Sequence, residues 1–130
     1  MSELPPSPVA ALLHAGLLVA DLARAKAFYE SVLGLTPYPH RPDLPYPGEW
    51  YDLGGGQQLH LMQLPNPDAG SVRPDHGGRD RHIALGVKDV EALRARLDAA
   101  GVSHTASQSG RSALFCRDPD MNTLEFVAVS

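Results

Sequence analysis

The stretch His14-Ala15-Gly16-Leu17-Leu18-Val19-Ala20-Asp21 decides the fold, because it returns in the second half of the chain as His82-Ile83-Ala84-Leu85-Gly86-Val87-Lys88-Asp89. In both copies the histidine precedes a valine by five residues and an aspartate by seven. Each copy leads into a helical run that closes on a glycine, Gly34 or Gly101. Self-similarity of this kind predicts a duplicated module.

The repeated stretch predicts a strand followed by a helix. Residues 12–19 and 81–87 are short, apolar and free of proline, as strands are, and Asp21 and Asp89 stand where helix N-caps belong. Three shorter strands are expected after each helix, at 36–40, 49–53 and 57–64 in the first half and at 102–107, 111–117 and 122–129 in the second. The sequence therefore predicts an α+β fold of two βαβββ modules, about 10–64 and 80–130, that form a curved mixed sheet.

Two segments fit neither module. Residues 37–48 contain five prolines and are expected to run as an extended strip over the surface. Residues 65–79 are rich in proline, glycine and aspartate and are interpreted as the linker between the modules. Gly54-Gly55-Gly56 has no helix behind it and predicts a hairpin turn rather than a phosphate loop.

Composition limits the classes of function. The chain has 130 residues, 43% of them hydrophobic, and a formal net charge of −4, which predicts a single domain over 1–130 and argues against nucleic acid and membranes as partners. One cysteine, Cys116, allows neither an intrachain disulfide nor a cysteine-based zinc site and is expected in the core. With no signal peptide recognised at its start, the protein is expected in the cytoplasm.

Four ionisable residues interrupt apolar strands: His14, His60, His82 and Glu125. Because side chains alternate along a strand, the apolar neighbours of each one face the helices, and the four are expected together on the other, concave face. Such a cluster is costly unless it is paired or holds a cation. Three imidazoles and one carboxylate suit zinc, nickel, cobalt or ferrous iron and argue against calcium or magnesium.

The duplicated plan and the ending Asp118-Pro119-Asp120-Met121-Asn122-Thr123-Leu124-Glu125 resemble the vicinal oxygen chelate superfamily. That superfamily includes glyoxalase I, fosfomycin-resistance proteins, methylmalonyl-CoA epimerase, extradiol dioxygenases and bleomycin-resistance proteins. The resemblance implies one divalent metal held by His14, His60, His82 and Glu125. It also implies a small-molecule substrate and a homodimer, with ligands from one subunit or from two.

Departures from each subfamily narrow the function. Leu18 replaces an arginine that binds glutathione in glyoxalase I, Met121 stands at a usual glycine, and only Phe126-Val-Ala-Val-Ser130 follows Glu125, where fosfomycin-resistance proteins carry basic residues. His60 would fill a position that dioxygenases keep open. The resemblance therefore favours a glyoxalase-like lyase or isomerase that binds a small oxygenated substrate bidentately to the metal. An iron-dependent dioxygenase and a drug-sequestering protein without turnover stay as alternatives.

One carboxylate among four ligands leaves a cationic metal site, which favours an anionic bidentate ligand. Glu125 is then the expected proton shuttle. Four further residues are weaker candidates for substrate binding: Trp50, Tyr51, Arg111 and Arg117. For the two arginines, surface ion pairs are the stronger expectation.

Overall fold

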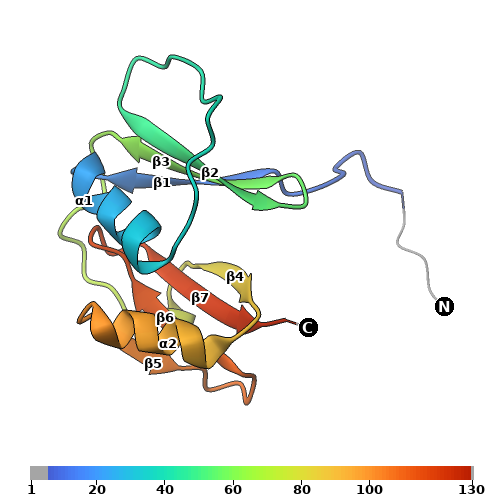
Figure 1. The fold of residues 1–130 in the computed structure, drawn as a ribbon, viewed down its shortest axis with the longest axis vertical. Helices are drawn as coiled ribbons and strands as arrows, with labels where there is room; N and C mark the ends of the chain where they lie inside the picture. Colours follow the sequence, from blue (N-terminus) through green and yellow to red (C-terminus); the bar gives the residue numbers. More distant parts are fainter. Residues whose placement is uncertain (1–5, 130) are drawn as a thin grey trace.

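The computed structural model describes residues 6–129 and contains two modules, of which the second has the expected βαβββ order and the first has one strand fewer (Figure 1). The first module consists of β1 (His14–Val19), α1 (Leu22–Lys26), a π-helical continuation η1 (Ala27–Val32), β2 (Gly48–Gly54) and β3 (Gln57–Gln63). Its strands form a sheet of order β1-β3-β2, in which β1 runs parallel and β2 antiparallel to β3.

The second module follows a single 3-10 turn, η2 (Gly77–Arg79), that lies at the end of the linker. It consists of β4 (Ile83–Val87), α2 (Val90–Ala99), β5 (His104–Ala106), β6 (Ala113–Arg117) and β7 (Thr123–Ala128). The sheet order is β4-β7-β6-β5, with β4 parallel to β7 and the other pairs antiparallel. The predicted α+β fold is confirmed, although the strands form two mixed sheets rather than one.

Both helices begin and end where the sequence predicts. The Asp21 side chain accepts a hydrogen bond from the Arg24 backbone N–H at 3.3 Å, and the Asp89 side chain accepts one from Ala92 at 3.0 Å. Gly34 and Gly101 have φ of 78° and 70°, a left-handed conformation that costs glycine little. The same local rules therefore set the ends of both helices.

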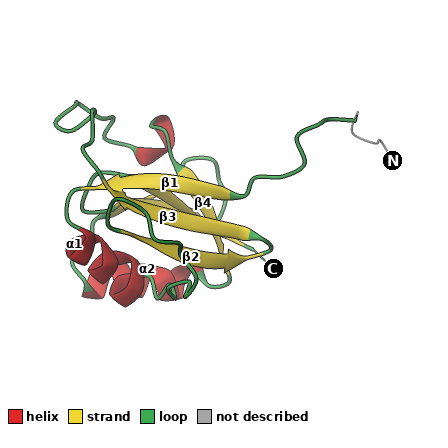
Figure 2. Ribbon diagram, turned by 90° about the horizontal axis from the view of Figure 1, so that it is seen from above, coloured by secondary structure: helices red, strands yellow, loops and turns green. Residues whose placement is uncertain are grey.

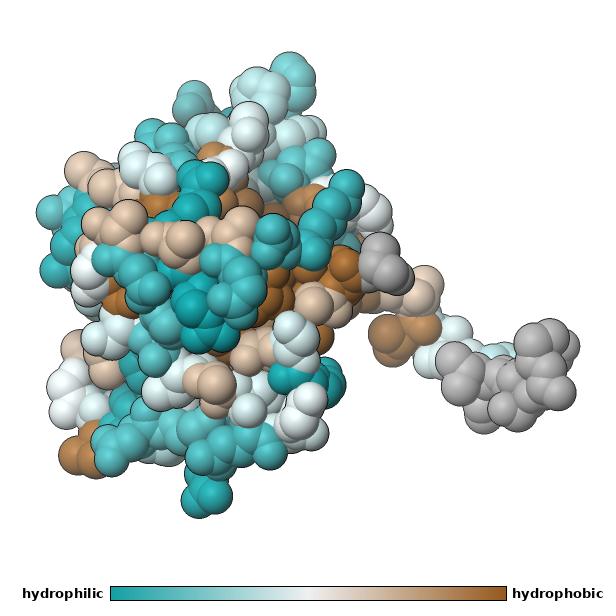
Figure 3. Space-filling view, turned by 60° about the horizontal axis from the view of Figure 1, so that its bottom comes forward, coloured by the Kyte–Doolittle hydropathy of each residue, from teal (hydrophilic) through white to brown (hydrophobic). Residues whose placement is uncertain are grey.

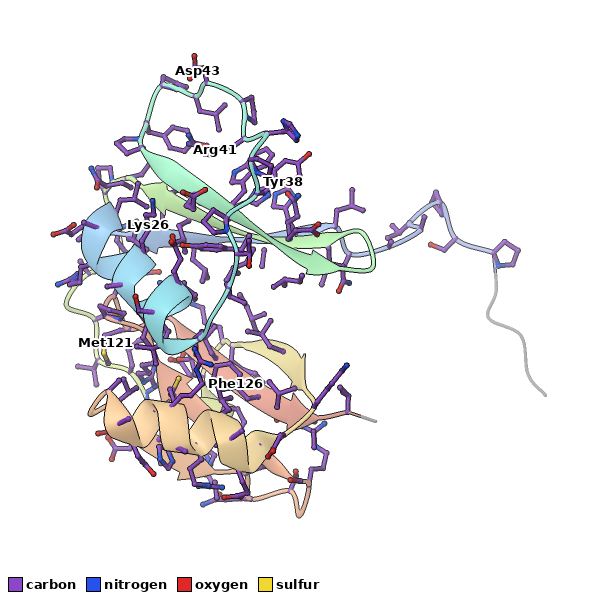
Figure 4. The ribbon with its side chains drawn as sticks, viewed as in Figure 1. Lys26, Tyr38, Arg41, Asp43, Met121 and Phe126 are labelled. Atoms are coloured by element: carbon purple, nitrogen blue, oxygen red, sulfur yellow. The ribbon has the colours of Figure 1, made fainter. Side chains whose placement is uncertain are left out.

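The strand predicted at 36–40 is wrong. This segment makes only an isolated bridge between Pro37 and Tyr51. Proline has no backbone N–H to donate, so the proline-rich strip expected at 37–48 does not form a regular ladder with β2, which begins at Gly48. It loops over the outer side of the first sheet, where Figure 4 shows Tyr38 and Arg41.

One hydrophobic core serves both modules. The inward face of the first sheet contributes Tyr51, Leu59 and Leu61, while the second sheet contributes Leu114, Cys116, Leu124 and Phe126, all buried together with residues of α1, η1 and α2. Figure 2 shows both helices on one side of the strands. Since these faces pack into the shared core, the opposite face of each sheet looks away from it.

A turn between β6 and β7 joins the modules. The Asp118 carboxylate accepts hydrogen bonds from the Tyr29 hydroxyl at 2.7 Å and from the Asn122 side chain at 2.9 Å. The Asn122 amide also donates to the Leu18 carbonyl at the end of β1, at 3.1 Å. The most specific motif of the sequence therefore acts as a connection between the two halves. No helix within residues 6–129 is long and apolar enough to cross a membrane.

Candidate metal centre

The first sheet presents two of the predicted ligands as a stacked pair. The rings of His14, on β1, and His60, on β3, lie 4.1 Å apart between centroids at an angle of 17°. Trp50, which is paired with His60 across β2 and β3, stacks on the other side of His60 at 3.9 Å and 2°. His60 is therefore held between two rings and is only 8% exposed.

The environment of His60 keeps its imidazole neutral. Burial, together with the nearby His14 and Arg41, lowers the pKa of His60 to about 4. Its Nε2 lies 2.9 Å from Oε1 of Gln58, which shares the same face of β3. A neutral imidazole with a lone pair is the form that binds a metal ion. The sequence analysis did not include Gln58 among the candidate site residues, although its spacing of two residues from His60 places it on that face.

The second sheet presents the other two predicted ligands. His82 precedes β4, and its Nε2 lies 3.4 Å from Oε1 of Glu125 on β7. Nδ1 of His82 lies 2.8 Å from the Asp80 carbonyl, which only accepts, so Nδ1 donates this hydrogen bond and Nε2 is the ring nitrogen that faces Glu125. Glu125 is 2% exposed, and its Oε2 accepts a hydrogen bond from Arg111 at 2.8 Å.

Two arginines hold the segment that precedes His82. Arg73 and Arg117 each form an ion pair of 2.7 Å with the Asp80 carboxylate. Burial would raise the pKa of Asp80, but the hydrogen bonds from Arg117 and Arg73 outweigh it and hold that pKa well below its usual range. The backbone carbonyl of Asp80, which orients His82, is thereby fixed in place.

The four weaker candidates for substrate binding separate into two groups. Trp50 and Arg111 lie at the predicted ligands, against His60 and Glu125. Arg117 is used in the Asp80 ion pair, and Tyr51 is fully buried on the core face, where its hydroxyl donates to Glu30 at 2.8 Å. Tyr51 therefore does not face either pair of ligands.

The four predicted ligands do not meet within one chain. Among the described residues, no group of three or more histidine, cysteine, aspartate or glutamate side chains lies close enough to hold a metal ion. The reason is the shared core: each pair lies on the face of its sheet that looks away from that core. The donor atoms are of the types that suit a transition metal, but each sheet carries only half of the predicted ligand set. We call His14 and His60 the N-terminal pair, and His82 and Glu125 the C-terminal pair.

Comparisons with a protein-family model and with known proteins point to the same family. Residues 11–126 match the model of the Glyoxalase/Bleomycin resistance protein/Dioxygenase superfamily. A lactoylglutathione lyase of Haemophilus influenzae is 30% identical over 123 residues, which cover 89% of this chain and 90% of that protein.

Solved structures share the fold. A glyoxalase family protein from Bacillus anthracis superposes with a TM-score of 0.76 at 19% identity, over 97% of this chain and all of that one. The antibiotic-binding protein TnmS3 from a Streptomyces species superposes with a TM-score of 0.68 at 23% identity, over 96% of this chain and all of that one. At these identities the two structures support the fold alone.

Proposed function

The chain belongs to the Glyoxalase/Bleomycin resistance protein/Dioxygenase superfamily, and on that premise we propose that it is a divalent-metal-dependent lyase or isomerase. Its substrate is a small oxygenated molecule that binds the metal through two oxygen atoms. The observation that carries this proposal is the pair of half-sites: two stacked imidazoles on one sheet, and an imidazole with a buried carboxylate on the other.

The complete ligand set forms between two copies of the chain. A dimer with a twofold axis is the simplest such arrangement. In it, one surface of each copy contacts a different surface of its partner, and the axis makes this contact occur twice. The N-terminal pair of one copy then faces the C-terminal pair of the second, and each dimer holds two sites. Within residues 6–129, the strands β1 and β4, which carry or adjoin His14 and His82, each pair with a strand on one side only, so the other edge can make this contact.

The ligands His14, His60, His82 and Glu125 suit zinc, nickel, cobalt or ferrous iron. When bound, such an ion supplies Lewis acidity that withdraws electrons from the oxygen atoms of the substrate. The chain itself supplies the base. Arg111 occupies Oε2 of Glu125, so Oε1, which faces His82, is the oxygen that would hold the metal and, when held only loosely, would accept a proton from the substrate.

Two variants test where the site forms. His14→Ala disables the N-terminal pair and His82→Ala the C-terminal pair, so neither protein alone should retain metal-dependent turnover. If the site spans two copies, a refolded equal mixture contains heterodimers with one intact site, and about one quarter of the wild-type sites should return. If each site forms within one chain, the mixture stays without sites. Elemental analysis of the wild type and of both variants, prepared without chelators, measures the number of intact metal sites without the need for a substrate.

Two other functions predict different results. Iron in the elemental analysis, with activity that disappears without oxygen, would favour a dioxygenase. A protein that sequesters a ligand without metal is favoured by one observation, because the Arg111–Glu125 ion pair already balances the buried carboxylate. That function predicts a binding isotherm for a small molecule, no metal after reconstitution and no turnover.

A further inference from the structure

A cavity of about 270 Å³ lies beside the C-terminal pair. His82 and Glu125 form one part of its wall. The rest comes from η2 and from the loop between β5 and β6, including Arg79, Ser107, Ser109 and Arg111. We call it the cationic cavity. Its volume is near the lower end of the range for small-molecule pockets.

The charges on this cavity favour an anion. Arg79 and Arg111 bring two guanidinium groups, whereas Glu125 is the single carboxylate among the described residues that line it. These two guanidinium groups and one carboxylate leave one positive charge in excess before any metal is bound. Arg79 is exposed and makes no hydrogen bond or ion pair with another side chain in residues 6–129, so its donors are available.

The β5–β6 loop gathers its polar groups on the cavity. The hydroxyls of Ser107 and Ser109 lie 2.8 Å apart, and Nε of Arg111 donates to the Ser109 hydroxyl at 3.3 Å. Gly110, with φ of 84°, allows the sharp turn that brings Arg111 back toward the serines. Hydroxyls next to guanidinium groups are suited to oxyanions, which accept several charge-assisted hydrogen bonds at once.

We propose that the cationic cavity binds an oxyanion, either a carboxylate or a phosphoryl group, at the end of the substrate that does not chelate the metal. This inference rests on the proposed function, because it takes the C-terminal pair as part of the chelating centre. The substrate is then a small molecule with two ends: a chelating hydroxy or keto acid, and a second anionic group directed toward Arg79.

The binding of three α-hydroxy acids tests whether the non-chelating end of the substrate carries an anionic group. Glycerate, malate and 3-phosphoglycerate share the chelating end and differ in carrying a hydroxyl, a carboxylate or a phosphate at the other. Calorimetric titration of the zinc-loaded protein should give an affinity at least about tenfold higher for malate or 3-phosphoglycerate than for glycerate. The tighter of the two identifies the oxyanion. Equal affinities for all three acids would overturn the inference.

Arg79→Gln should remove most of that preference, because it removes a guanidinium that pairs with no side chain in the described part of the chain. Arg94→Gln is the matched control, since Arg94 lies on α2, where it pairs with Glu91. The preference should survive in the control. Loss of the preference in both variants would contradict a specific role for Arg79.

The metal-free protein separates this inference from the proposed function. Inorganic phosphate is titrated into labelled protein, and amide resonances of residues 107–111 are followed. They should shift in the wild type and in Arg94→Gln but not in Arg79→Gln, whether or not zinc binds. A failed zinc titration with the phosphate shifts intact contradicts only the proposed function. Absent phosphate shifts contradict the cavity's role.

Discussion

The fluorescence of Trp50 can report on metal binding at the N-terminal pair. It is the single tryptophan of the chain, and its ring lies against His60 at 3.9 Å. A paramagnetic ion bound at His60 is expected to quench its emission strongly over so short a distance. We therefore expect Co²⁺ or Ni²⁺ to quench the fluorescence of the wild type at stoichiometric metal, and Zn²⁺ to leave most of it.

The matched variants are His60→Ala and His104→Ala. His104 lies on β5 and pairs with Asp98, so its replacement should leave the quenching unchanged. His60→Ala should abolish stoichiometric quenching. If both variants were quenched like the wild type, His60 would not be a ligand.

Cys116 shows how burial alone determines the chemistry of a residue. It is 4% exposed, and burial, followed by the nearby Asp118, raises the pKa of its thiol to about 12. In the unfolded chain the thiol ionises near pH 9. The unfolded state therefore loses a proton that the folded state keeps, and the free energy of unfolding falls as the pH rises above 9.

This difference predicts a pH dependence specific to Cys116. Between pH 8 and pH 10, the free energy of unfolding of the wild type should fall by about 1 kcal/mol more than that of Cys116→Ala. Urea unfolding at the two pH values measures both slopes, and the other titrating groups cancel in the comparison. Parallel slopes would show that the folded thiol ionises normally. The prediction that Cys116 is an unreactive core residue would then be wrong.

At the scale of elements, the β6–β7 turn has more than a local role. Asp118 is 3% exposed and binds the Tyr29 hydroxyl of η1, so its carboxylate links the modules. Asp118→Ala removes the acceptor of that hydroxyl and of one of the two hydrogen bonds that the Asn122 side chain donates. We expect a loss of about 2 to 4 kcal/mol in the free energy of unfolding.

A double-mutant cycle with Tyr29→Phe isolates the link between the modules. Tyr29→Phe removes only the hydroxyl, so the two losses should be less than additive by about 1 kcal/mol or more. Urea denaturation of the four proteins measures the coupling. Additive losses would mean that Asp118 stabilises its own turn and not the contact between the modules.

Local sequence patterns predicted most of the helices and strands. The caps Asp21 and Asp89 and the glycine ends follow from neighbouring residues, so the sequence suffices for them. Strict alternation would also have excluded Tyr51 from the ligand face, because it follows Trp50 directly on β2. At Met121, a φ of 67° shows that the turn keeps the left-handed conformation without the usual glycine (Figure 4).

The arrangement of the two sheets was beyond these local patterns. Alternation assigns His14 and His82 to the polar face of each strand, but it does not say how two sheets pack. Their apolar faces share one core, which separates the N-terminal pair from the C-terminal pair. The sequence analysis therefore left open whether the ligands come from one subunit or from two, because that depends on this long-range packing.

At the scale of the whole molecule, the segment before β1 projects from the body as an arm (Figures 1 and 3). We define the N-terminal arm as residues 6–13. Its apolar side chains Val9, Leu12 and Leu13 are 76%, 69% and 64% exposed. Its base is fixed, because the Leu13 carbonyl accepts a hydrogen bond from the Gln58 backbone at 2.9 Å. The arm leads directly into His14, which requires a second copy to complete the proposed site.

We therefore expect the N-terminal arm to pack on the second copy of the dimer. Burial of an aliphatic side chain stabilises a contact by about 1.5 to 3 kcal/mol, so the double variant Val9→Ser, Leu12→Ser should raise the dimer dissociation constant at least about tenfold. Sedimentation velocity over a dilution series measures it. Val72→Ser makes the same chemical change at a fully exposed linker position and should leave the constant unchanged. A monomeric wild type, or equal constants for the arm variant and this control, would exclude the arm from the interface, whereas selective weakening would connect the exposed arm to assembly of the metal site.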